Sequence, residues 1–177
     1  AAPKPPVAIE PDGALDLERI TREAAALGPG LFGFILWLDA KLVERGFHGM
    51  SDYWKASIGA FLASGKRSGV WRVGRGGAKS TTLVRIAVAV ALFGERTIPP
   101  GQRWIWPFIS VSSLDAQRRI QEIQSILSAI GVVPTKVLRG NNPSIELEDA
   151  RGNTIAFVAL ASNIRGVSGP STMGGTI

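Results

Sequence analysis

The chain contains no cysteine and only one histidine, His48. The lack of cysteine excludes a disulfide framework and a zinc–thiolate site, and a single histidine excludes a metal site built from several imidazoles. His48 lies in the short stretch 45–50, which we interpret as a loop between two helices. Chemistry that needs thiolates or a histidine cluster is therefore excluded.

Long apolar runs are also missing. The longest uninterrupted aliphatic and aromatic run near the N-terminus, residues 34–38, is far shorter than the roughly 20 residues of a membrane span. Residues 1–11 are rich in proline rather than apolar, so they do not indicate a signal peptide. We expect a cytosolic protein with a flexible Pro-rich extension at 1–11 and no membrane partner.

Acidic residues are scarce in one part of the chain. Residues 1–65 carry six Lys or Arg and eight Asp or Glu, whereas residues 66–139 carry twelve against three, a net charge of +9. A basic block of this size is typical of contact with a polyanion, and nucleic acid is the obvious candidate. Some of these charges would serve a bound nucleotide or only solvate the surface.

Residues 73–81, Val-Gly-Arg-Gly-Gly-Ala-Lys-Ser-Thr, form the most informative segment. An apolar stretch at 69–73 precedes the glycines, and a long apolar helix is predicted after Lys79. Strand, Gly-rich loop and helix in this order are typical of a P-loop, in which backbone N–H groups and a helix N-terminus surround a phosphate. The lysine then reaches the terminal phosphates, and a Ser or Thr hydroxyl ligates magnesium. The segment predicts a nucleoside triphosphate site.

The spacing departs from the common pattern G-x-x-x-x-G-K-[ST]. Val73 and Ala78 occupy the two glycine positions, and the glycines stand at neighbouring positions instead. Arg75 adds a second cation inside the loop. A Gly-rich turn without a ligand is the alternative interpretation, but the flanking apolar segments favour the P-loop.

Hydrophobic periodicity predicts an N-terminal helical segment at 12–65 and an α/β P-loop domain at 66–177. The first part contains predicted helices at 12–27, 31–45 and 51–65, the last with Ser51 as its N-cap. The second part contains predicted strands and helices in alternation, which indicates a parallel sheet. Its strands are expected at 69–73, 104–113 and 132–138, and its helices at 82–93 and 114–130. Ser144–Glu148 and Thr154–Leu160 are predicted to form a β-hairpin.

Four segments occur in an order that is familiar from one family. They are the loop at 74–81, the residues 109–113 with Ala-Gln-Arg at 116–118, the predicted hairpin, and Ser-Asn-Ile-Arg-Gly-Val-Ser-Gly at 162–169. Together they resemble the large terminase subunits, the ATPases of double-stranded DNA phage packaging motors. The resemblance covers about residues 50–177. It implies a P-loop NTPase-type α/β fold, with a mostly parallel sheet flanked by helices and the hairpin as an insertion.

The resemblance also implies roles for individual residues. Lys79 would contact the β- and γ-phosphates of ATP, and Ser80 would ligate Mg²⁺. Arg75 would sense or stabilise the γ-phosphate, and Arg165 is a candidate arginine finger for a neighbouring subunit's site. The residues that would surround the nucleotide are Gly74, Arg75, Gly76, Gly77, Ala78, Lys79, Ser80 and Thr81.

The partners implied by the resemblance are those of a packaging motor. They are double-stranded DNA, the portal protein, a small terminase subunit and further copies of the chain in a homo-oligomeric ring. The implied location is the host cytoplasm, with transient docking on the viral procapsid. No adenine-contacting motif is evident upstream of the loop. Tyr53 and Trp54 could stack on a base, although packing in the core is the favoured interpretation.

A P-loop ATPase needs an Asp for magnesium and a Glu to activate water. Glu148-Asp149 is the only tempting pair downstream, but it ends an alternating strand that suits an exposed hairpin. The resemblance places the acids just beyond Ile177, so we expect an incomplete ATPase domain that is weakly active or inactive alone. Two alternatives stay open: a non-catalytic module that binds nucleotide and nucleic acid, and another DNA-dependent P-loop ATPase such as a helicase.

Overall fold

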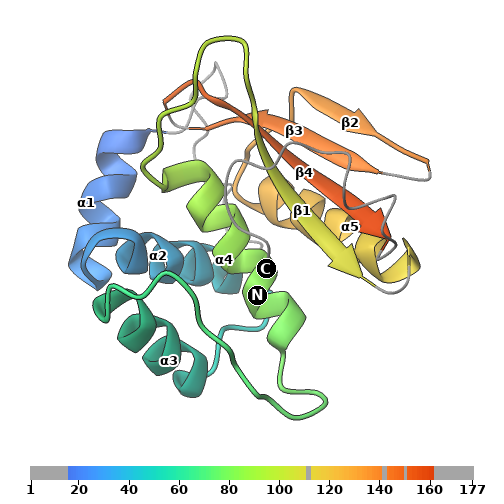
Figure 1. The fold of residues 1–177 in the computed structure, drawn as a ribbon. Coiled ribbons are helices and arrows are strands. Elements are labelled where there is room, and N and C mark those ends of the chain that lie inside the picture. The colour runs from blue at the N-terminus through green and yellow to red at the C-terminus, as the bar shows by residue number, and fades with distance from the viewer. Residues whose placement is uncertain (1–15, 111–112, 141–142, 150, 162–177) are drawn as a thin grey trace, which may run out of the picture.

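The computed structural model describes residues 16–110, 113–140, 143–149 and 151–161, so the extension at 1–11 and the segment around Arg165 lie outside it. Within these ranges the chain is α/β, with five helices and a mixed sheet of four strands (Figure 1). The helices are α1 (Leu17–Leu27), α2 (Gly30–Glu44), α3 (Asp52–Ala63), α4 (Lys79–Phe93) and α5 (Ser113–Ala129). The strands are β1 (Trp104–Ser110), β2 (Lys136–Leu138), β3 (Ser144–Glu148) and β4 (Thr154–Ala161).

The three predicted N-terminal helices form, and side chains cap two of them. The carboxylate of Asp16 accepts a hydrogen bond from the backbone N–H of Arg19 and begins α1. The hydroxyl of Ser51 accepts from the backbone N–H of Trp54 and begins α3, which confirms the predicted N-cap. The helices pack against one another through α2, and α2 packs against α4 (Figure 1). One hydrophobic core therefore includes these helices, α4, α5 and the sheet.

Helices α1 and α2 meet at a sharp corner. A Cβ at Gly33 would lie 2.4 Å from the carbonyl oxygen of Ala24 and 2.3 Å from that of Gly28, so only glycine permits this approach. Among the described helices, no single one has the length and apolar character of a membrane span. Helices α1 and α2 reach that length and composition only together, across a 99° bend.

Helix α4 is apolar on nearly every face, and the prediction that it lies in the interior is confirmed. It begins at Lys79, three residues before the predicted start, and it lies between α2 and α5. Its one buried charged side chain, Arg85, is 3% exposed and pairs with Asp39 of α2. The helix therefore connects the N-terminal helices to the α/β part of the molecule.

The sheet has the strand order β1-β4-β3-β2. Only β1 and β4 are parallel, with Trp104 opposite Ile155, and the other two pairings are antiparallel. The expectation of a mostly parallel sheet is therefore wrong for the four described strands. The predicted hairpin forms as β3 and β4, and it belongs to the main sheet because β4 also pairs with β1. Strand β4 lies between β1 and β3, and its residues are buried on both faces, as Ala156 and Phe157 show.

The strand predicted at 69–73 does not form, and this is the main correction to the predicted P-loop fold. The segment is an extended connection outside the sheet, in which the side chain of Val70 is 89% exposed. Trp71 packs instead on Phe61 of α3, with the ring centroids 5.2 Å apart. An aromatic side chain such as Trp71 can pack against a helix as well as in a sheet, so the composition of this stretch did not decide between them. The strand predicted at 132–138 is likewise reduced to the exposed β2.

Candidate functional site

The Gly-rich loop forms a tight turn directly before α4. The backbone N–H of Gly77 donates to the carbonyl of Gly74 at 3.2 Å, and Gly76 has a φ of +82°. Ala78 has a φ of +54° and a ψ of +25°, the left-handed conformation that favours glycine. It is the only non-glycine residue of the described chain with a positive φ. The second glycine position of the common motif thus keeps a glycine-like backbone although alanine occupies it.

The N-terminus of α4 is open. Ala78 has no side chain that could cap it, and the first backbone hydrogen bond runs from Thr82 N–H to Ala78 C=O at 3.0 Å. The N–H groups of Lys79, Ser80 and Thr81 therefore have no acceptor in the part of the chain that the structure describes. Unpaired N–H groups and the positive end of the helix dipole make this position suitable for an anion.

Lys79 folds back over the loop. Its Nζ donates to the carbonyl oxygens of Val73 at 3.2 Å and Gly74 at 3.3 Å. The exposed side chains of Ser80 and Arg75 lie at the same end of α4. Arg75 thus lies in the turn and Lys79 and Ser80 in the first turn of α4, whereas Arg165 lies outside the described residues.

Helix α3 contacts the loop through the side chain of Trp54. Trp54 is 3% exposed, and its indole N–H donates to the carbonyl of Gly77 at 2.9 Å. The prediction that Trp54 packs in the core is confirmed, but Tyr53 is 55% exposed, so that prediction is wrong for Tyr53. Sequence reasoning missed the bond to Gly77, because no local signal joins residues 23 positions apart.

A buried ion pair fixes the middle of α4. Arg85 donates from Nη1 to the carboxylate of Asp39 and from Nη2 to the backbone carbonyl of His48. Asp39 also accepts the backbone N–H of Met50 at 2.9 and 3.2 Å and lies 3.6 Å from the Nζ of Lys55. One carboxylate of α2 thus joins α3, α4 and the loop between α2 and α3.

The C-terminal end of α4 is closed by side chains. Arg96 donates to the carbonyls of Ala91 and Val90, stacks 4.0 Å above the Trp104 ring and pairs with Asp149. Burial lowers the pKa of the Arg96 guanidinium from its ordinary value; Asp149 opposes this shift and nearby Arg151 adds to it.

Asp149 has a structural role at this end of the helix. It accepts hydrogen bonds from the backbone N–H groups of Arg151 and Asn153 and from the side-chain amide of Asn153. The prediction that Glu148-Asp149 ends a hairpin strand is confirmed, since Glu148 lies opposite Thr154 in the antiparallel β3–β4 pair. Asp149 itself is buried, contrary to the exposed hairpin that the sequence suggested.

Comparisons with protein-family models, with curated proteins and with solved structures found no match to this chain. Nor does the described part of the chain gather three or more Asp, Glu or His side chains into a metal site. Magnesium normally binds to proteins through few side chains together with phosphates and water, so the Ser80 hydroxyl fits such a site as one ligand.

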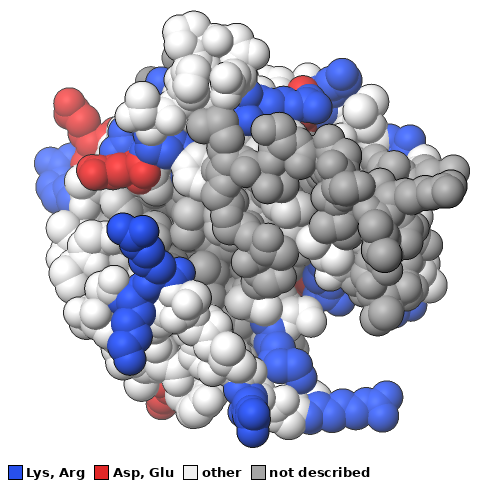
Figure 2. Space-filling view, in the orientation of Figure 1, with Lys and Arg blue, Asp and Glu red and all other residues white. Residues whose placement is uncertain are grey.

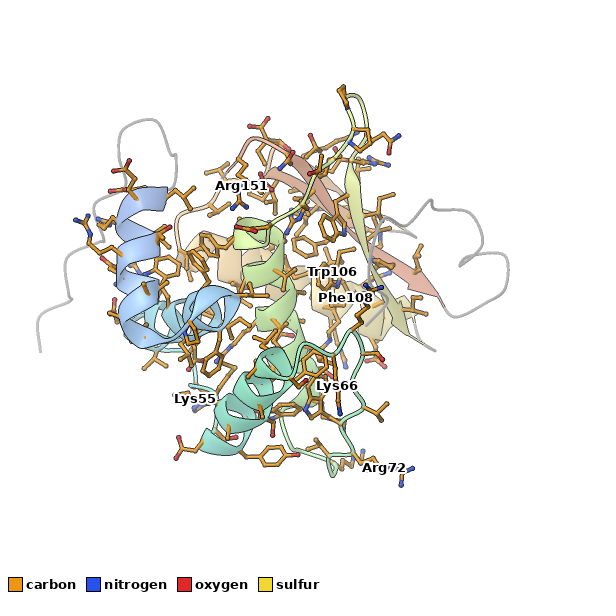
Figure 3. The ribbon with its side chains drawn as sticks, turned by 60° about the vertical axis from the view of Figure 1, so that its left-hand side comes forward. Lys55, Lys66, Arg72, Trp106, Phe108 and Arg151 are labelled. Carbon is orange, nitrogen blue, oxygen red and sulfur yellow. The ribbon has the colours of Figure 1, made fainter. Side chains whose placement is uncertain are left out.

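Exposed cations lie along the connection from α3 to α4, which includes the loop. Lys66, Arg67, Arg72 and Arg75 are all exposed, and none of them has a carboxylate partner among the described residues. We call these four residues the basic segment. In Figure 2, Lys and Arg side chains extend from the lower edge of the molecule, where Figure 1 places the α3–α4 connection. Figure 3 shows Arg72 projecting from this end, while Arg151 lies near the opposite end of α4.

Proposed function

We propose that residues 73–81 bind the phosphates of ATP together with Mg²⁺, and that the chain is the ATPase domain of a DNA-packaging motor of the large terminase type. The observation that carries the proposal is the geometry of the loop. Lys79 lies across two loop carbonyls, beside a helix N-terminus whose first three N–H groups have no acceptor in the described chain. The order of the four terminase-like segments supports the family.

Each residue of the loop has a distinct task in this proposal. Phosphate oxygens accept from the N–H groups of the loop and of the first turn of α4. The Nζ of Lys79 exchanges two neutral carbonyls for a charged phosphate oxygen, which is the stronger acceptor. Ser80 offers its hydroxyl to the magnesium, which neutralises phosphate charge when bound. The exposed guanidinium of Arg75 adds positive charge at the γ-phosphate.

The remaining parts of the proposal come from the resemblance. Arg165 completes the site of a neighbouring subunit in a ring, the ring docks on the portal protein of a procapsid in the host cytoplasm, and a small terminase subunit recruits it to double-stranded DNA. Hydrolysis then drives the DNA into the capsid.

The first experiment is the titration of Lys79→Ala with MgATP by calorimetry. We expect the affinity to fall at least about tenfold, because a charged hydrogen bond to phosphate contributes about 1.5–3 kcal/mol. We expect the free energy of unfolding to change by less than about 0.5 kcal/mol, since among the described residues Lys79 bonds only to two loop carbonyls. Lys136→Ala, an exposed lysine on β2, is the matched control. An unchanged ATP affinity in Lys79→Ala would contradict the phosphate site.

The basic segment favours a second candidate, a non-catalytic module that binds nucleic acid and holds nucleotide as a structural ligand. Four free cations predict a DNA affinity that falls with salt at a log–log slope of about −3 to −4. If an ATP analogue leaves both affinity and slope unchanged, the module is favoured. If the analogue changes DNA affinity, the motor or another DNA-dependent ATPase such as a helicase is favoured.

A further inference from the structure

We infer that Trp54 is a positioning residue of the phosphate-binding loop, and this inference rests on the proposed function. The indole N–H of Trp54 holds the carbonyl of Gly77 at 2.9 Å. A trans peptide is planar, and its C=O and N–H point in opposite directions. Because the Gly77 carbonyl points toward α3, the N–H of Ala78 in the same peptide points away from α3. That N–H has no acceptor among the described residues.

The conformation of Ala78 supports this account. A left-handed alanine costs about 1–2 kcal/mol relative to the right-handed form, so surrounding contacts must hold it. The Trp54 bond acts on the peptide that enters Ala78, immediately before α4 begins at Lys79. The bond therefore sets the direction of an N–H at the entrance to the open helix N-terminus.

Trp54 itself is rigidly placed. It is buried on α3, and its ring contacts those of Tyr53 and Trp71 at centroid distances of 5.6 and 6.3 Å. The next residue, Lys55, pairs with Asp39, which in turn pairs with Arg85 of α4. Helix α3 is thus linked to α4 by two ion pairs that share Asp39 of α2. It is linked to the loop by the indole of Trp54, so the loop is fastened to the packed helices.

The inference specifies which part of the ligand Trp54 affects. A peptide N–H beside the helix N-terminus can bind phosphate oxygens but does not distinguish one base from another. The contribution of Trp54 is therefore the same for ATP, GTP and tripolyphosphate, each bound with magnesium.

The test compares Trp54→Phe with Trp71→Phe in the 177-residue chain. Both variants replace an indole in the same aromatic cluster, but only Trp54 donates a hydrogen bond to the loop. We expect MgATP, MgGTP and magnesium tripolyphosphate to bind about tenfold more weakly to Trp54→Phe, and within about twofold of the unmodified protein to Trp71→Phe. Amide hydrogen exchange at Gly77, whose N–H donates to the Gly74 carbonyl within the loop, should be faster only in Trp54→Phe.

The outcomes separate the inference from the proposed function. Equal affinities for the two variants, with Lys79→Ala weakened, overturn the role of Trp54 alone. Failure of the unmodified protein to bind ATP or tripolyphosphate overturns both. If Trp54→Phe does not fold, benzothienylalanine at position 54 keeps the fused rings and lacks only the N–H. The same loss of affinity and the same faster exchange are then expected, and their absence overturns the inference.

Discussion

At its C-terminal end helix α4 is closed by side chains, whereas at its N-terminal end it is open. Arg96 donates to carbonyls of the last turn, and Arg151 donates to the carbonyl of Gly94. Arg96 also pairs with Asp149, which links this end of the helix to the β-hairpin. At the other end, the first three N–H groups have no acceptor in the described chain, and Ala78 is held in an unfavourable conformation.

This difference indicates different roles for the two ends. Satisfied carbonyls and a buried carboxylate are typical of a part that maintains the fold, because each removed partner would leave a buried group unpaired. Free N–H groups, a strained residue and exposed cations are typical of a part that binds a ligand. Substitutions at the closed end should therefore change stability, and substitutions at the open end should change binding.

The largest loss of stability is expected for a substitution of Arg85, which lies halfway between the two ends of α4. Arg85→Ala leaves the buried Asp39 carboxylate without its guanidinium, and we expect the free energy of unfolding to fall by about 3–5 kcal/mol. Urea denaturation measures the change. The double variant Asp39→Leu with Arg85→Leu should be more stable than Arg85→Ala, because it leaves no unpaired buried charge. A fall below 1 kcal/mol in Arg85→Ala would show that the pair does not hold α4 in place.

A smaller loss is expected at the closed end. Asp149→Ala removes the acceptor of two backbone N–H groups and the partner of the buried Arg96, so we expect a loss of about 2–3 kcal/mol in stability. MgATP affinity should stay within about twofold, the reverse of the pattern expected for Lys79→Ala. Asp149→Asn, which keeps an acceptor oxygen, is the control and should lose less stability. A loss of ATP affinity in the folded Asp149→Ala protein would contradict the division between the two ends.

The smallest change in stability is expected for a substitution at the open end, at Ala78. Ala78→Gly removes a left-handed strain of about 1–2 kcal/mol, and the flexibility of glycine in the unfolded chain offsets about 0.5–1 kcal/mol of that gain. We therefore expect a net stabilisation of up to about 1.5 kcal/mol in thermal unfolding. Ala60→Gly, at an exposed right-handed position inside α3, should instead destabilise by about 1 kcal/mol. Destabilisation of similar size in both variants would show that Ala78 is not strained.

Local patterns predicted most of the helices and the Gly-rich turn of the candidate site, but not the contacts that hold this turn in place. The cap Ser51, the apolar faces of α4 and the hairpin strands depend on neighbouring residues, so they can be read from a short window. The Gly-rich turn followed for the same reason, although the helix after it begins at Lys79, three residues before the predicted start. The strand expected at 69–73 does not form, because Trp71 packs on Phe61 of α3 instead of joining the sheet.

The sequence by itself determined the turn before α4, since its closely spaced glycines allow backbone conformations that other residues adopt at a cost. Only the tertiary structure decided what holds that turn. The Trp54–Gly77 bond joins residues 23 positions apart, and the Asp39–Arg85 pair joins residues 46 positions apart. No local preference specifies such contacts, because they form only when packing of the whole core brings α2, α3 and α4 together.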